Sequence, residues 1–131
     1  MDPQEISILL VEDNPDDIAF TRRVLKFSKL DKDLAIAKDG QEALDALENM
    51  ALAKKLPDMV LLDINLPVIS GLELLTRIKQ DPRFKKMPVV MLTGSNVGGD
   101  IQKSYDLGAS TYLVKPISHD ALMLVVNNLF S

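Results

Sequence analysis

Five residues able to act together on a phosphoryl group each follow a short apolar run: Glu12, Asp13, Asp63, Thr93 and Lys115. Three clustered carboxylates repel one another, so without a cation one of them tends to hold a proton. Mg²⁺ and the lysine together supply three positive charges against three negative ones. Magnesium prefers carboxylate, carbonyl and water oxygens. The set predicts a magnesium site that can hold and neutralise a phosphoryl group.

Asp63 is the predicted nucleophile, because apolar residues 59–62 and Ile64 flank it. A carboxylate with a reference pKa of about 3.9 is ionised at neutral pH and needs no general base. Phosphoryl transfer then requires mainly positioning and charge neutralisation. Asp13 and Asp63 are the expected direct metal ligands, with Glu12 acting through water and the backbone carbonyl of Asn65 completing the set. Mn²⁺ could replace Mg²⁺.

Five apolar runs alternate with longer helical patterns, and this alternation must position these residues. The predicted strands cover 6–11, 34–37, 59–62, 89–92 and 111–114. The segments between successive strands are too long for hairpins and have helical patterns. They therefore predict an α/β fold, a doubly wound five-stranded parallel sheet with helices on both faces. In such a sheet the ligand site lies beyond the carboxyl ends of the strands. The five residues therefore converge on one rim.

Helix-boundary signals support this division of the chain. Asn14 is a predicted N-cap, and Asp16 and Asp17 complement the positive end of the helix that follows. Gly108 is a predicted left-handed stop. The pair at 98–99 weakens the fourth predicted helix, which is either loosely held or replaced by a long loop.

Length and composition set the broad class. The 131 residues predict one domain over 1–131, and the 47% hydrophobic and 26% charged content is typical of a globular protein. A net charge of -4 argues against direct binding to nucleic acid. The sequence contains no cysteine, no signal-peptide pattern and no apolar run long enough to cross a bilayer. A cytoplasmic protein without membrane contact is expected.

Four motifs, in this order and spacing, resemble the response-regulator receiver domain. They are 10–14 (LVEDN), 63–67 (DINLP) leading to Gly71, 92–94 (LTG) and 112–116 (YLVKP). The resemblance runs from Ile6 to the last helix. It implies a flavodoxin-like strand order 2-1-3-4-5 and a two-component signalling function. A sensor histidine kinase or a phosphotransfer protein would phosphorylate Asp63.

The resemblance also assigns roles to individual residues. Thr93 would be the hydroxyl that senses phosphate, Tyr112 the aromatic residue that moves with it, and Lys115 would precede a cis peptide bond to Pro116. Phosphorylation would switch a protein-interaction face formed by the last strand and the last two helices. No enzyme activity is implied beyond self-catalysed phosphotransfer and dephosphorylation. The opening 14–17 and the stretch 78–93 resemble stand-alone regulators paired with phytochrome-like sensor kinases. The downstream protein is not predicted.

The last predicted helix is apolar over 121–126, more than a surface helix needs for one buried stripe. Either neighbouring helices cover the remainder, or it meets a partner. Homodimerisation is the favoured interpretation, with Leu122 and Val125 as its expected interface residues.

Three other kinds of protein could share this pattern. A phosphatase or phosphotransferase would place a second aspartate two residues after the nucleophile, where this chain has Asn65. A pseudo-receiver would bind partners without phosphorylation, but every expected acidic, hydroxyl and lysine position is filled. A receiver excised from a longer regulator would look the same as a stand-alone one. The Met1 start and the end just after the last helix favour a stand-alone receiver with no output domain.

Overall fold

The computed structural model describes residues 5–94 and 98–130. Five strands form one parallel sheet in the order β2-β1-β3-β4-β5, which confirms the predicted topology. The elements alternate along the chain as β1 (Ser7–Val11), α1 (Pro15–Phe27), β2 (Asp33–Ala37), α2 (Gly40–Leu52), β3 (Met59–Asp63), α3 (Gly71–Gln80), β4 (Val89–Thr93), α4 (Gly98–Asp106), β5 (Thr111–Val114) and α5 (His119–Phe130).

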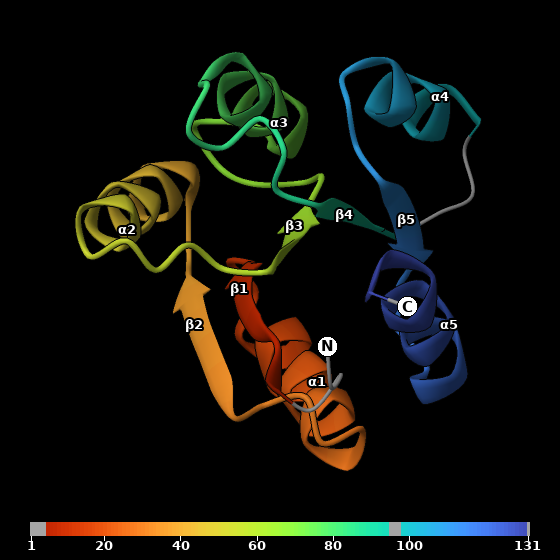
Figure 1. Cartoon of the computed structure of the whole chain (residues 1–131). Coiled ribbons are helices and arrows are strands. Elements are labelled where there is room, and N and C mark those ends of the chain that lie inside the picture. The colour runs from red at the N-terminus through yellow and green to blue at the C-terminus, as the bar shows by residue number, and fades with distance from the viewer. Residues whose placement is uncertain (1–4, 95–97, 131) are drawn as a thin grey trace.

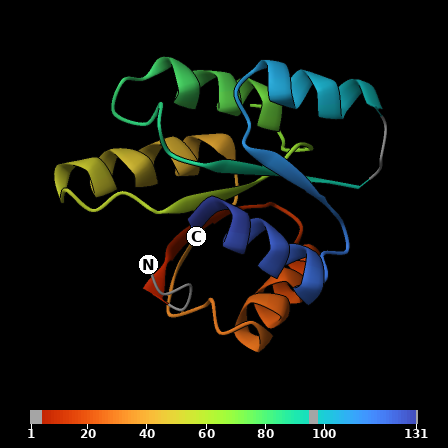
Figure 2. The same cartoon turned by 45° about the vertical axis from the view of Figure 1, so that its right-hand side comes forward.

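The sheet separates two hydrophobic cores, because side chains on a strand alternate between its faces. On one face, Leu9 and Leu62 of the central strands pack in a core with residues of α2 and α3. On the other face, Leu10 and Leu61 pack in a core with residues of α1 and α5. Figures 1 and 2 show α1 and α5 on one side of the sheet and the other three helices opposite. The predicted helix-covered sheet is confirmed.

The predicted helix boundaries correspond to observed caps. The Asn14 side-chain oxygen accepts hydrogen bonds from the backbone N–H groups of Asp16 at 2.9 Å and Asp17 at 3.1 Å. This cap starts α1 directly after the end of β1, so its first turn lies beside the rim that carries the predicted site. Gly108 has a φ of 105°, a left-handed conformation that glycine adopts without steric cost. Gly98 and Gly99 form the first turn of α4 rather than a long loop.

The last helix is covered more completely than its sequence predicts. Leu122 and Val126 are fully buried in the core shared with α1, while Leu124 is 63% exposed. The expectation that Leu122 lies at a dimer interface was therefore wrong. The sheet and α1 bury this part of the helix, an arrangement that follows from tertiary packing rather than from the helix sequence.

We expect Leu122→Asp and Leu124→Asp to differ sharply in stability. A carboxylate at the Leu122 position would be buried without a partner, which places its cost among the large effects of point mutations, at least about 3 kcal/mol. The same substitution at Leu124 should change stability by about 0.5 kcal/mol or less, since surface changes are usually small. Urea denaturation followed by circular dichroism measures both. Equal loss of stability in the two variants would contradict the assignment of Leu122 to the core.

Among the residues that the structure describes, none of the helices combines the length and the apolar character needed to cross a membrane.

Candidate functional site

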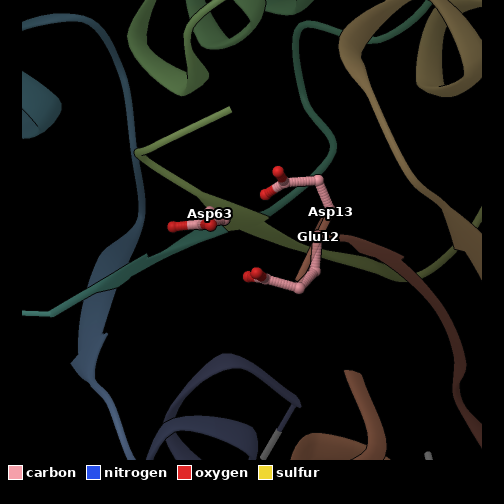
Figure 3. Close-up of side chains that lie close together, drawn as sticks. All are labelled: Glu12, Asp13 and Asp63. Atoms are coloured by element: carbon pink, nitrogen blue, oxygen red, sulfur yellow. The ribbon is translucent and has the colours of Figure 1, made fainter. Parts of the chain in front are cut away.

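Three acidic side chains meet at the carboxyl ends of β1 and β3. Glu12 and Asp13 directly follow β1, and Asp63 is the last residue of β3. One oxygen from each carboxylate lies within 4.8 Å of the others, and Figure 3 shows the three groups turned toward a common space. Glu12 and Asp63 are only 1% and 2% exposed, whereas Asp13 is exposed. The predicted acidic cluster is present in the fold.

Lys115 enters this cluster from the end of β5. Its ammonium nitrogen lies 3.0 Å from Glu12 Oε2 and 3.2 Å from Asp63 Oδ2. The backbone N–H of Lys115 donates to the Thr93 carbonyl at 2.7 Å, which ties the lysine to the end of the neighbouring strand β4. The peptide bond from Lys115 to Pro116 is cis, as the resemblance implied. Residues 103 positions apart in sequence thus form one charged site.

The crowding of charge perturbs the ionisation of the site. Burial raises the pKa of Glu12, and the nearby Asp63 carboxylate raises it further, to about 7 despite the opposing effect of Lys115. Burial alone would lower the pKa of Lys115, but hydrogen bonds to carboxylates raise it above its ordinary value. The site holds more negative charge than one lysine neutralises, which is the electrostatic condition for binding a divalent cation.

The segment after β3 brings Asn65 back to the nucleophile. The Asn65 backbone N–H donates to Asp63 Oδ1 at 3.1 Å, and the residue itself is exposed at the rim. The backbone N–H of Gly71 donates to the Ile64 carbonyl at 2.9 Å, which holds the start of α3 against the end of β3. Two backbone contacts therefore fix the position of Asp63 and of the peptide units that follow it.

Thr93 and Tyr112 lie on adjacent strands that lead to the site. Thr93 ends β4 and is buried, and Tyr112 is half-buried on β5 opposite Met91. The ring of Tyr112 packs edge-on against Tyr105 of α4, with 6.3 Å between ring centroids. Tyr112 thus contacts the helix that the predicted switch would move.

Asp17 joins the site although its sequence position gave it only a helix-dipole role. Its Oδ2 lies 3.0 Å from the Lys115 ammonium, at the same distance as Glu12. The N-cap at Asn14 is the sequence signal for this contact, because it fixes the start of α1 at the rim and places its first turn beside the lysine.

A cavity of about 600 Å³ adjoins the cluster between α1 and the β5–α5 connection. Asp17, Asn65 and Lys115 line it, together with Phe20 and Arg23 of α1. The cavity therefore borders the lysine that contacts Glu12 and Asp63.

Comparison with known proteins agrees with this geometry. A family model described as the response regulator receiver domain matches residues 8–127. The response regulator Rcp1 of Synechocystis sp. is 42% identical over 110 residues, covering 82% of this chain and 75% of that protein.

Solved structures of response regulators are also similar, two of them named as phytochrome response regulators. The bacteriophytochrome response regulator RtBRR matches with a TM-score of 0.85 at 36% identity, over 96% of this chain and 78% of that one. A phosphorylated cyanobacterial phytochrome response regulator, RcpA, matches with a TM-score of 0.77 at 36% identity, over 95% and 90%. The Mn²⁺-bound form of Rcp1 matches with a TM-score of 0.73 at 38% identity, over 95% and 91%.

Proposed function

Because this chain belongs to the response regulator receiver family of two-component signalling, we propose that Asp63 accepts a phosphoryl group with the help of Mg²⁺. The observation that carries the proposal is the position of Asp63. Its buried carboxylate lies 3.2 Å from the Lys115 ammonium and within 4.8 Å of the oxygens of two further acids. This arrangement supports Asp63 as the nucleophile, because a cation and further carboxylate oxygens surround it.

The residues present fit a divalent metal ion. Asp13 and Asp63 would bind it directly, with Glu12 acting through water and the Asn65 backbone carbonyl completing the protein ligands. All of these donors are oxygens, the ligand type of Mg²⁺ and Mn²⁺, and the cluster sets the three carboxylates of Glu12, Asp13 and Asp63 against the one ammonium of Lys115. The Mn²⁺-bound structure of Rcp1 supports the assignment. The bound ion would neutralise charge on the phosphoryl oxygens.

The residues of the chain perform the transfer itself. An oxygen of Asp63 attacks the phosphorus atom, and the bond from phosphorus to the donor breaks as the new bond forms, so that the donor leaves with the bonding electron pair. Lys115 and the hydroxyl of Thr93 bind the phosphoryl oxygens. Transfer of this kind depends mainly on positioning and charge neutralisation. The contact of Asn65 with Asp63 and of Gly71 with Ile64 supplies the positioning.

The proposed switch runs from Thr93 to the last two helices. A phosphoryl group carries roughly -1.5 to -2 charges. The Thr93 hydroxyl turns toward this charge, and Tyr112 moves into the space that Thr93 leaves. The edge-on contact of Tyr112 with Tyr105 passes the movement to α4. The output is then a change in the face formed by α4, β5 and α5.

The proposed phosphodonor is a sensor histidine kinase or a histidine phosphotransfer protein in the cytoplasm. The similarity to RtBRR and RcpA favours a phytochrome-like kinase. The cavity along α1 would receive the donor, because Lys115 and Asn65 line it.

The protein would act by binding a downstream protein rather than nucleic acid, and would catalyse only its own phosphorylation and dephosphorylation. It would be a single domain over 1–131.

A homodimer is proposed at the outer side of β5 and α5. β5 is an edge strand, and a cavity of about 450 Å³ lies between it and α5. Exposed Leu124 and half-buried Val125 line this cavity, together with Leu113 and Leu129. The proposed interface therefore keeps Val125 from the sequence-based expectation and contains these residues instead of the buried Leu122.

Incubation with acetyl phosphate tests the proposed function. We expect the intact mass to rise by one phosphoryl group in the presence of Mg²⁺, and no rise when the metal is removed by a chelator. Adding Mg²⁺ back should restore the gain, which controls for damage by the chelator. Rapid loss of phosphate is checked by beryllofluoride binding. If the protein neither gains a phosphoryl group nor binds beryllofluoride, it is a pseudo-receiver and the proposed function is wrong.

A further inference from the structure

Lys115 is surrounded by three carboxylates and has three N–H groups to offer. Its ammonium donates hydrogen bonds of 3.0 Å to Glu12 and to Asp17 and lies 3.2 Å from Asp63. An ammonium has three donors and no acceptor. Two of these donors are used in the hydrogen bonds to Glu12 and Asp17, and phosphorylation of Asp63 removes the carboxylate charge that makes the third contact. A phosphoryl oxygen on Asp63 therefore competes with Glu12 and Asp17 for Lys115.

The three partners of Lys115 differ in how easily they can lose it. The side chains of Glu12 and Asp63 are 1% and 2% exposed, whereas that of Asp17 is 42% exposed. A buried carboxylate left without its partner carries a large penalty, and a half-exposed one is hydrated by water instead. Of the two carboxylates that remain when Asp63 is phosphorylated, Asp17 is thus the one that Lys115 can leave at least cost.

We propose that Asp17 is a positioning residue that holds Lys115 in the unphosphorylated protein and competes with the phosphoryl group for it. The proposal rests on phosphorylation at Asp63. When the phosphoryl group arrives, Lys115 exchanges Asp17 for a phosphoryl oxygen. Loss of this contact also removes an ion pair that joins the first turn of α1 to the residue after β5.

The Asp17 carboxylate opposes the binding of a phosphoryl group in two ways. It occupies one donor of Lys115, and its negative charge repels an incoming anion beside the site. Both weaken the binding of a phosphoryl group, so Asp17 shifts the balance toward the unphosphorylated state. Replacing it with a neutral residue should strengthen phosphoryl binding.

The neighbouring acid Asp16 provides a matched control. It lies in the same first turn of α1 and carries the same charge, but the contacts of Lys115 among the described residues do not include it. Both acids donate their backbone N–H groups to Asn14. Asp16→Asn therefore reproduces the loss of charge and of helix-dipole complementarity without touching the lysine.

The dissociation constant of beryllofluoride, a phosphoryl mimic, tests the exchange by titration calorimetry at saturating Mg²⁺. We expect Asp17→Asn to bind it about fivefold more tightly than wild type, the size of a half-exposed ion pair. Asp16→Asn should change the constant by about twofold or less, since Asp16 lines the same cavity but is exposed and makes no contact with Lys115. Asp17→Glu should return it toward the wild-type value. Asp17→Ser is a second neutral variant if Asp17→Asn folds poorly.

A double-mutant cycle with Lys115→Ala shows whether Asp17 acts through the lysine. In the Lys115→Ala background, Asp17→Asn should have no more effect than Asp16→Asn. The proposed exchange would be wrong if Asp17→Asn and Asp16→Asn changed beryllofluoride binding equally in the wild-type background. It would also be wrong if Asp17→Asn bound beryllofluoride more weakly than wild type. Neither result would contradict the proposed function. If wild type itself binds no beryllofluoride with Mg²⁺, phosphorylation at Asp63 and the exchange both fail.

Discussion

We expect the Asp63→Asn variant to take up phosphoryl groups from acetyl phosphate at least about a thousandfold more slowly than wild type, because it lacks the nucleophile. An amide has no negative oxygen with which to attack phosphorus. The other parts of the site remain, including Lys115 and the two acids that follow β1. The measurement is the intact mass over time in the presence of Mg²⁺.

The same variant should keep its fold. Asparagine has the shape of aspartate, and its side-chain oxygen can still accept the hydrogen bond from the Asn65 backbone N–H. The substitution also removes a buried negative charge beside Glu12, a like-charge contact that opposes folding. We therefore expect a melting temperature equal to or above that of wild type.

Asp16→Asn is the control for this experiment, since it removes one exposed acid near the site and should still be phosphorylated. Phosphorylation of Asp63→Asn at the wild-type rate would move the acceptor to another residue, with Asp13 the first candidate. Loss of folding in Asp63→Asn would instead mean that Asp63 has a structural role that outweighs the repulsion.

The rim that carries the site could be predicted because it follows from local patterns. Buried parallel strands appear as short apolar runs, and their carboxyl ends meet on one edge of the sheet. The first polar residues after each run are then rim residues, and on this basis the sequence predicts that Glu12, Asp13, Asp63, Thr93 and Lys115 lie together. The Asn14 cap is likewise local, since it depends on residues within one turn.

The role of Asp17 and the burial of Leu122 could not be predicted in the same way. Lys115 and Asp17 are 98 positions apart, and their contact depends on how α1 lies beside the end of β5. A helix sequence shows which residues are apolar but not how much of its surface its neighbours cover. The coverage of Leu122 by the sheet and α1 is a property of the assembled layers.

Gly71 is another residue whose importance depends on packing across the fold. Its sequence context predicts only a residue in the first turn of a helix capped by Ser70, and that cap is observed. In the structure, a Cβ atom added to Gly71 would lie 2.1 Å from the Asp63 carbonyl oxygen and 2.6 Å from the Ile64 Cα. Any side chain there would collide with the backbone that carries the nucleophile.

We expect Gly71→Ala to lose about 3 kcal/mol of stability or more, because overpacking against a backbone cannot be relieved by a side-chain rotation. Relief requires α3 or the end of β3 to move, and either movement displaces Asp63 from Lys115. The variant should therefore also lose most of its Mg²⁺-dependent phosphoryl uptake under conditions where it remains folded. Urea denaturation and intact mass measure the two effects.

Gly99→Ala is the matched control, since nothing lies within 4 Å of an added Cβ in the first turn of α4. Alanine is the better helix former by about 1 kcal/mol in a helix interior, so this variant should be as stable as wild type or slightly more so. Its phosphoryl uptake should be unchanged. If Gly71→Ala matched Gly99→Ala in both measurements, the close packing of α3 on the Asp63 peptide would not be what positions the nucleophile.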